Sequence, residues 1–157
     1  MPDTKKILFL LLIPALRAGC TVSDVPRSIS FTDSGCSKTL ASRAGYFDEA
    51  PSLLILKYED GNLRVTRTNA IMNCSIKEGG IGCDVTFDED VINYDVYEKD
   101  GPATNCMCPV EKMSSLITGL TLGKEYKFNY YYSHQPYPDY SPVTFIFEEG
   151  FVHIQGE

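Results

Sequence analysis

The sequence predicts an all-β domain, an antiparallel sandwich of two sheets, over residues 28–157. Two observations carry this prediction: short segments alternate apolar and polar residues, and turn signals rich in Gly, Asn, Asp and Pro separate them. A third is that no long segment shows helical periodicity. Several short strands joined by turns are typical of a sandwich or a barrel.

The first nineteen residues have the layout of a secretory signal peptide, which places the domain outside the cytoplasm. Lys5 and Lys6 precede an apolar run over residues 7–16, and the run ends at Ala18-Gly19-Cys20. The run is shorter than the roughly 20 apolar residues of a membrane-spanning helix. We therefore expect residues 1–19 to be a signal peptide.

Cys20 directly follows Ala-Gly, which is typical of a bacterial lipoprotein cleaved before the cysteine and lipidated on its sulfur. Residues 20–27 would then form a lipidated tether, and the expected location is the cell envelope, at the outer membrane. Arg17 fits the lipoprotein signal poorly, so ordinary secretion with an unmodified Cys20 stays open as the alternative.

The charge balance excludes nucleic acid as an expected partner. The chain has 14 basic and 21 acidic residues, a net charge of −7. Removal of residues 1–19 takes away three basic residues and Asp3, which leaves 11 basic and 20 acidic residues and a net charge of −9. An acidic surface repels phosphate backbones, and any membrane contact is expected through acyl chains.

The alternation places the strands in order along the domain. Asp60-Gly61 between two apolar segments predicts a β-hairpin, and Glu148-Glu149-Gly150 predicts a last hairpin. The clearest alternation puts Tyr126, Phe128, Tyr130 and Tyr132 on one core-facing side of a strand. The expected strands cover residues 28–32, 53–58, 63–68, 84–88, 92–97, 113–117, 124–132, 143–147 and 151–154.

The segment from Leu120 to Phe128 resembles the corner before the F strand of immunoglobulin-like and fibronectin type III domains. In that corner a leucine and a glycine precede a tyrosine whose hydroxyl bonds the backbone a few residues upstream. Tyr126 occupies the tyrosine position. The resemblance therefore favours an immunoglobulin-like sandwich over a closed barrel, with a structural role for Tyr126.

Five cysteines remain if Cys20 carries lipid, so at most two disulfides form and one thiol is left over. Cys106 and Cys108 would point to the same face of a strand and would each reach a different partner. The spacing favours a bridge from Cys74 to one of these two, with Cys83 or Cys36 as the next candidates. A thiolate site for zinc or copper(I) is the chemical alternative, but the spacings and the oxidising compartment favour disulfides, so we predict no metal and no cofactor.

Four segments together resemble a group of small uncharacterised envelope lipoproteins of Bacteroidetes bacteria with a predominantly β domain. The segments are Ser34-Gly35-Cys36-Ser37-Lys38, Leu63-Arg64-Val65 running to Asn73-Cys74, Cys106-Met107-Cys108, and Gly119 to Tyr126. The resemblance implies an envelope lipoprotein and supplies no catalytic residues.

The expected function is a non-enzymatic envelope lipoprotein whose disulfide-stabilised sandwich is a binding or structural module for a protein partner. The alternative is a carbohydrate-binding accessory protein, with Tyr131, Tyr137 and Tyr140 as the exposed ligand contacts. The acidic run Asp88-Glu89-Asp90 could attract calcium but lacks EF-hand spacing, and a charged turn explains it more simply. No nucleophile elbow, metalloprotease helix or phosphate loop is present, so we predict no catalytic residues.

Overall fold

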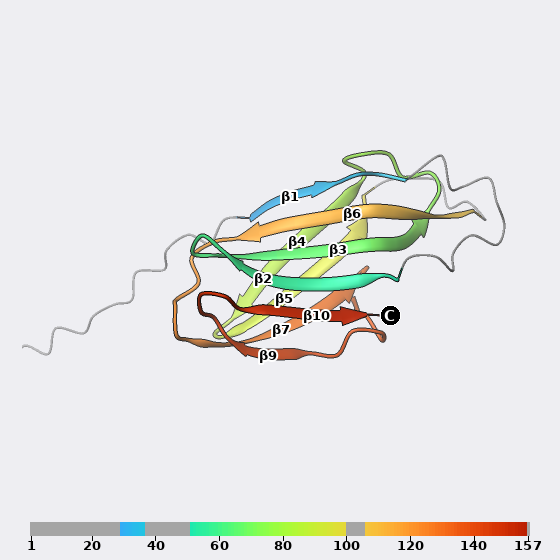
Figure 1. The fold of residues 1–157 in the computed structure, drawn as a ribbon. Coiled ribbons are helices and arrows are strands. Elements are labelled where there is room, and N and C mark those ends of the chain that lie inside the picture. Colours follow the sequence, from blue (N-terminus) through green and yellow to red (C-terminus); the bar gives the residue numbers. More distant parts are fainter. Residues whose placement is uncertain (1–28, 37–50, 100–105, 157) are drawn as a thin grey trace, which may run out of the picture.

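The protein folds into two five-stranded β-sheets, A and B, that pack face to face (Figure 1). The computed structural model describes residues 29–36, 51–99 and 106–156. The predicted signal peptide, the tether and Cys20 lie outside these residues. Within the described residues, no helix has the length and apolar character needed to cross a membrane.

Sheet A is wholly antiparallel. Its strands in spatial order are β1 (Ile29–Asp33), β6 (Met107–Ile117), β3 (Asn62–Asn73), β2 (Leu53–Glu59) and β10 (Val152–Gly156). The β2–β3 hairpin turns at Asp60 and Gly61, whose φ angles are +48° and +80°. Positive φ at both central residues is the geometry that Asp-Gly favours in a two-residue hairpin, so the predicted hairpin is confirmed.

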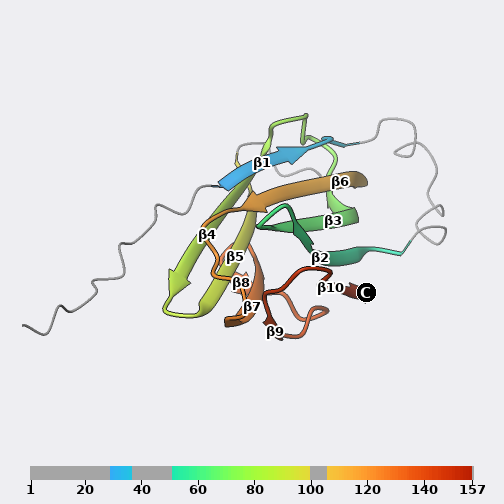
Figure 2. The same ribbon diagram turned by 60° about the vertical axis from the view of Figure 1, so that its left-hand side comes forward.

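Sheet B contains the only parallel pair among the described strands. It is built from β4 (Ile81–Asp88), β5 (Val91–Glu98) and β7 (Glu125–Tyr132), with β8 (Gln135–Pro136) and β9 (Val143–Ile146) both paired to β7. Figure 2 shows the two sheets as separate layers, and Figure 1 shows the strands of sheet B running obliquely behind those of sheet A. The acidic run covers Asp88, the last residue of β4, and the turn residues Glu89 and Asp90 that lead into β5. Asp90 is ion-paired with Lys124.

Two features of the connectivity differ from the prediction. The strands β5 and β7 are parallel, because the chain passes through β6 in the opposite sheet before it returns to sheet B. The predicted last hairpin is wrong: β9 pairs with β7, whereas β10 pairs with β2 in sheet A. The turn at Glu148–Gly150 therefore carries the chain from one sheet to the other, between the stacked rings of Phe145 and Phe151, whose centroids are 4.5 Å apart.

A single apolar core fills the space between the sheets. The inward side chains of β2 and β3 face those of β5 and β7, as period-two alternation predicts. Fully buried members include Leu56, Val65, Ile92 and Phe128. Tyr126, Phe128 and Tyr130 all lie in this core, at 1 %, 1 % and 4 % exposure, so their predicted common face is confirmed.

Tyr126 makes the hydrogen bond that its sequence context predicts. Its buried hydroxyl accepts from the backbone N–H of Thr121, five residues upstream, at 3.0 Å. Gly123, at φ +78°, turns the chain between these two residues. The bond fixes the approach to β7, because a buried phenol needs a partner and the backbone corner supplies it.

Replacement of Tyr126 by phenylalanine tests this corner. Tyr126→Phe keeps the ring but removes the acceptor for Thr121, so we expect the free energy of unfolding to fall by about 1 kcal/mol. Chemical denaturation followed by circular dichroism measures the change. Tyr58→Phe is the matched control, because the Tyr58 ring packs on Phe147 at 5.4 Å without a corresponding backbone bond. Equal stability of the two variants would contradict the role of the hydroxyl.

Candidate functional site

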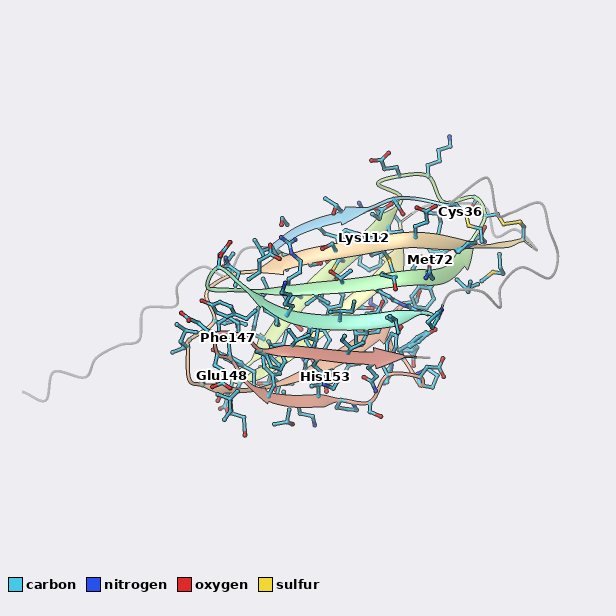
Figure 3. All side chains as sticks on the ribbon, viewed as in Figure 1. Cys36, Met72, Lys112, Phe147, Glu148 and His153 are labelled. Carbon is cyan, nitrogen blue, oxygen red and sulfur yellow. A yellow bond between two sulfur atoms is a disulfide. The ribbon has the colours of Figure 1, made fainter. Side chains whose placement is uncertain are left out.

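Four of the cysteines gather where β1 and β3 end and β6 begins (Figure 3). Cys36 is bonded to Cys108, with Cα atoms 5.9 Å apart, and Cys74 is bonded to Cys106, with Cα atoms 5.3 Å apart. The second bridge is one of the two pairings that the sequence favoured. Cys106 and Cys108 also reach different partners, as their spacing predicts.

The loop after β1 is shaped to deliver Cys36 to this cluster. The Asp33 carboxylate accepts the backbone N–H groups of Gly35 and Gly79, each at 3.0 Å. Gly35 has φ +63°, and a Cβ there would lie 2.4 Å from the backbone nitrogen of Glu78. Only glycine fits this approach, so Ser34-Gly35-Cys36 is a structural turn that positions a disulfide.

The four cysteines of the alternative thiolate metal site do not lie together in the structure. Among the described residues, the only group of three or more potential ligands close enough to share an ion is Cys36, Cys74 and Cys108. All three are in disulfides, and a disulfide sulfur carries no thiolate. Cys83, which the alternative also needed, is the one free cysteine of the described residues and lies elsewhere, on β4.

Cys83 is a half-buried thiol inside the sandwich. Its sulfur lies 3.8 Å from the Ser115 hydroxyl, which is also 2.6 Å from the hydroxyl of Tyr94. Burial raises the pKa of the Cys83 thiol, against the opposing hydrogen bonds from Tyr94 and Ser115. A thiol of this kind is weakly nucleophilic.

A second unusual feature is a buried cation, which we call the Arg67 cage. Arg67 on β3 is 3 % exposed, and its guanidinium donates to the hydroxyls of Tyr130 at 3.2 Å and Tyr137 at 2.9 Å. Its Cζ atom lies 4.5 to 5.4 Å from the ring centroids of Tyr130, Tyr137 and Tyr140. Burial raises the pKa of Tyr130 well above its ordinary value, although Arg67 acts in the opposite direction.

The cage corrects the predicted exposure of the loop tyrosines. Tyr140 is 4 % exposed and hydrogen-bonded to Ser52 at 3.0 Å, and Tyr137 is half-buried. The rings of Tyr137 and Tyr140 turn inward because they pack against the buried guanidinium of Arg67. The signal for the cage was available in the sequence: Leu63, Val65 and Arg67 occupy successive inward positions of one strand.

Tyr131, Tyr137 and Tyr140, the three predicted contacts, all line one cavity of about 460 Å³, together with Lys127 and Asn129. Tyr131 differs from the other two because it also lines a second cavity that is rich in polar groups. This second cavity has a volume of about 340 Å³ and lies on the outside of sheet B, and we call it the sheet-B groove. The remaining lining residues are Asp84, Thr86, Asn93, Asp95 and His134.

The register of three neighbouring strands assembles the sheet-B groove. Asp84 on β4 lies opposite Asp95 on β5, and Asp95 lies beside Tyr131 on β7. In the next row Asn129 donates its amide to Asn93 at 2.9 Å. These residues are distant in sequence, and only the parallel β5–β7 pairing aligns them, so alternation alone could not identify the groove.

His134 closes one end of the sheet-B groove. Its backbone N–H donates to Asp95 at 3.1 Å, and its ring nitrogen Nδ1 contacts the other oxygen of the same carboxylate. The Tyr97 ring lies 5.7 Å from the imidazole, and its hydroxyl donates to Asp84 at 3.4 Å. The groove thus presents fixed carboxylates, amides and an imidazole beside one aromatic ring.

Comparisons of the chain with protein-family models, with curated proteins and with solved structures find no match. The fold and site therefore define the class of protein only coarsely: a disulfide-bonded protein of two β-sheets. The envelope lipoproteins that the sequence resembles receive no support from these comparisons.

The disulfide assignment predicts one thiol in a chain that carries Cys20→Ser. Under denaturing conditions without reductant, we expect one alkylated cysteine per chain, at Cys83, and none after Cys83→Ser. In the folded protein Cys83 should react much more slowly, because it is half-buried and its pKa is raised. Mass spectrometry after alkylation measures both results, and four or five modified cysteines would contradict the two bridges.

Proposed function

We propose that the protein is a non-enzymatic binding module of the bacterial cell envelope, held to the outer membrane by lipid on Cys20. Two disulfides indicate an oxidising, extracytoplasmic location. The basic residues, short apolar run and Ala18-Gly19-Cys20 sequence support export and lipidation. The Tyr126 corner supports a likeness to immunoglobulin-like sandwiches.

The observation that carries a binding role is the sheet-B groove. Asp84 and Asp95 face each other directly across β4 and β5. Like charges in this position destabilise a sheet, although His134 contacts Asp95 and the Tyr97 hydroxyl donates to Asp84. A ligand that donates hydrogen bonds to both carboxylates would stabilise Asp84 and Asp95 in this arrangement.

The same groove gives little support to catalysis. The His134 imidazole contacts Asp95 and the ring of Tyr97. Among the described residues, no serine, threonine or cysteine side chain is hydrogen-bonded to it, although an activated nucleophile needs such a contact. Binding is therefore the function that the geometry supports best.

Carbohydrate is the ligand class that fits the groove. Carboxylate and amide oxygens accept from sugar hydroxyls, amide and imidazole nitrogens donate to them, and the half-exposed Tyr131 ring offers an apolar face. The cavity of about 340 Å³ falls in the range of small-ligand sites. A protein partner would instead need about 800 Å² of surface on each side, which the groove alone does not provide.

A glycan array with the chain from residue 20 onward tests this proposal. We expect selective binding of a neutral saccharide, weakened about tenfold by Tyr131→Ala and by Asp84→Asn, since each removes a principal contact. Asp88→Asn on the same face of β4 and Ile146→Ala on β9 are matched controls outside the groove. Saccharide binding that all four variants retain equally would contradict the assignment.

The lipid anchor is tested separately by the intact mass of protein extracted from membranes. We expect a mass excess from acyl groups that Cys20→Ala removes, together with release of the protein into the soluble fraction. Reduction should add four hydrogen atoms, two for each disulfide. An unmodified Cys20 in soluble wild-type protein would instead establish ordinary secretion.

A further inference from the structure

The outer face of sheet A carries a second concavity, which we call the sheet-A pocket. It has a volume of about 600 Å³ and is lined by residues of β1, β2, β3 and β6 and by Ser34, which follows β1. Three of its side chains are cations: Lys57, Arg64 and Lys112. Figure 3 shows Lys112 on β6, in the layer opposite sheet B. In a chain with net charge −7, this is a local reversal of sign.

Two of the three cations lie directly opposite each other on neighbouring strands, which does not favour the stability of the sheet. Lys57 and Arg64 are direct cross-strand partners in the β2–β3 ladder, and facing like charges destabilise a sheet. Glu59 offsets part of this repulsion, because Arg64 holds its carboxylate through two nitrogens, at 2.5 and 3.2 Å. Arg64 thereby lowers the pKa of Glu59, and Lys57 and Lys112 add to the effect.

The second carboxylate of the pocket, Asp33, is hydrogen-bonded to backbone groups and not to the cations. Asp33 accepts the backbone N–H groups of Gly35 and Gly79, so its oxygens serve the loop that positions Cys36. Within the pocket, Glu59 is thus the carboxylate that the cations share. Because Asp33 keeps its charge, the three cations of the pocket stand against two carboxylates, which leaves a net charge of about +1.

A row of hydroxyls lies beside the cations. Ser114 on β6 is paired in register with Thr32 on β1 and with Thr66 on β3. Its hydroxyl lies 3.4 Å from that of Thr66 and accepts from Arg64 at 3.4 Å. Hydroxyls next to a guanidinium can donate to the oxygens of an anion that the guanidinium binds.

We propose that the sheet-A pocket binds a phosphate monoester group. The planar Arg64 fork exchanges Glu59 for two phosphate oxygens, Lys57 and Lys112 contribute point charges, and Thr66 and Ser114 donate hydrogen bonds. A phosphate monoester carries a charge between −1.5 and −2 near neutral pH, so the positive excess of the pocket attracts it. This site goes beyond the proposed saccharide function, because it lies on the opposite sheet and needs none of the groove residues.

The test is calorimetric titration of the chain from residue 20 onward with inorganic phosphate, glucose 6-phosphate and glucose. We expect both phosphates to bind and glucose not to compete at this pocket. Lys57→Gln and Lys112→Gln should each weaken phosphate about threefold, and Arg64→Lys should weaken it about tenfold. Lys77→Gln, an exposed lysine outside the pocket, is the matched control and should change nothing.

Glu59→Gln gives the sharpest result, because it removes the competing carboxylate but keeps the shape of the side chain. We expect phosphate affinity to rise about fivefold, an outcome that unfolding cannot imitate. No phosphate binding in wild type, an unchanged or lower affinity in Glu59→Gln, or an equal loss in Lys77→Gln would each overturn the proposal. Phosphatidic acid vesicles, compared with phosphatidylcholine vesicles, distinguish the source: vesicle binding lost in Arg64→Lys assigns the phosphate to a lipid headgroup, and binding of the soluble phosphates alone assigns it to a free ligand.

Discussion

The burial of Arg67 between the sheets is the interaction on which the tyrosine-rich half of the molecule depends. An uncompensated charge in a protein interior costs several kcal/mol, so the guanidinium must be surrounded by groups that satisfy it. Tyr130 comes from β7, whereas Tyr137 and Tyr140 come from the segment that follows. To bring all three rings to one cation, that segment folds back on β7, and the N–H of Tyr137 bonds the carbonyl of Tyr130. Sheet A, through Arg67, thereby fixes the course of the chain in sheet B.

The sheet-B groove depends on the same constraint. Successive side chains of a strand point to opposite faces, so a Tyr130 held inward by Arg67 requires Tyr131 to face outward. The parallel pairing of β5 and β7 then sets Tyr131 beside Asp95, and Asn129 beside Asn93. The Arg67 cage and the sheet-B groove therefore lie on opposite faces of β7. A side chain with no contact to ligand can still decide where the aromatic edge of the groove lies.

Alternation predicts most strands, the Asp-Gly turn signal predicts the β2–β3 hairpin, and the resemblance to an immunoglobulin-like corner predicts the Tyr126 contact. Each of these depends on residues close in sequence. Alternation shows which face a side chain occupies, but it does not show which strand lies next to it. For this reason the sequence joined β9 to β10, whereas the structure places them in different sheets. The pairing of Cys36 with Cys108 depends on the Asp33 loop, which has no periodic signature. The loop position of Tyr140 predicts exposure, whereas Arg67, a charged residue at an inward position of β3, holds the Tyr140 ring in the core.

The two outer faces show the same departure from sheet stability, with opposite signs. Lys57 faces Arg64 on sheet A, and Asp84 faces Asp95 on sheet B. Each hairpin would be more stable with opposite charges at the pair, since facing charges of unlike sign attract and those of like sign repel. Natural sequences depart from local consistency mainly where function requires it. Two such departures, each within a concavity and each beside hydrogen-bonding side chains, are the observations that support the two proposed binding faces. The disulfide cluster and the Arg67 cage stiffen the sandwich between them, so each face can be kept in a shape that its own side chains would not stabilise.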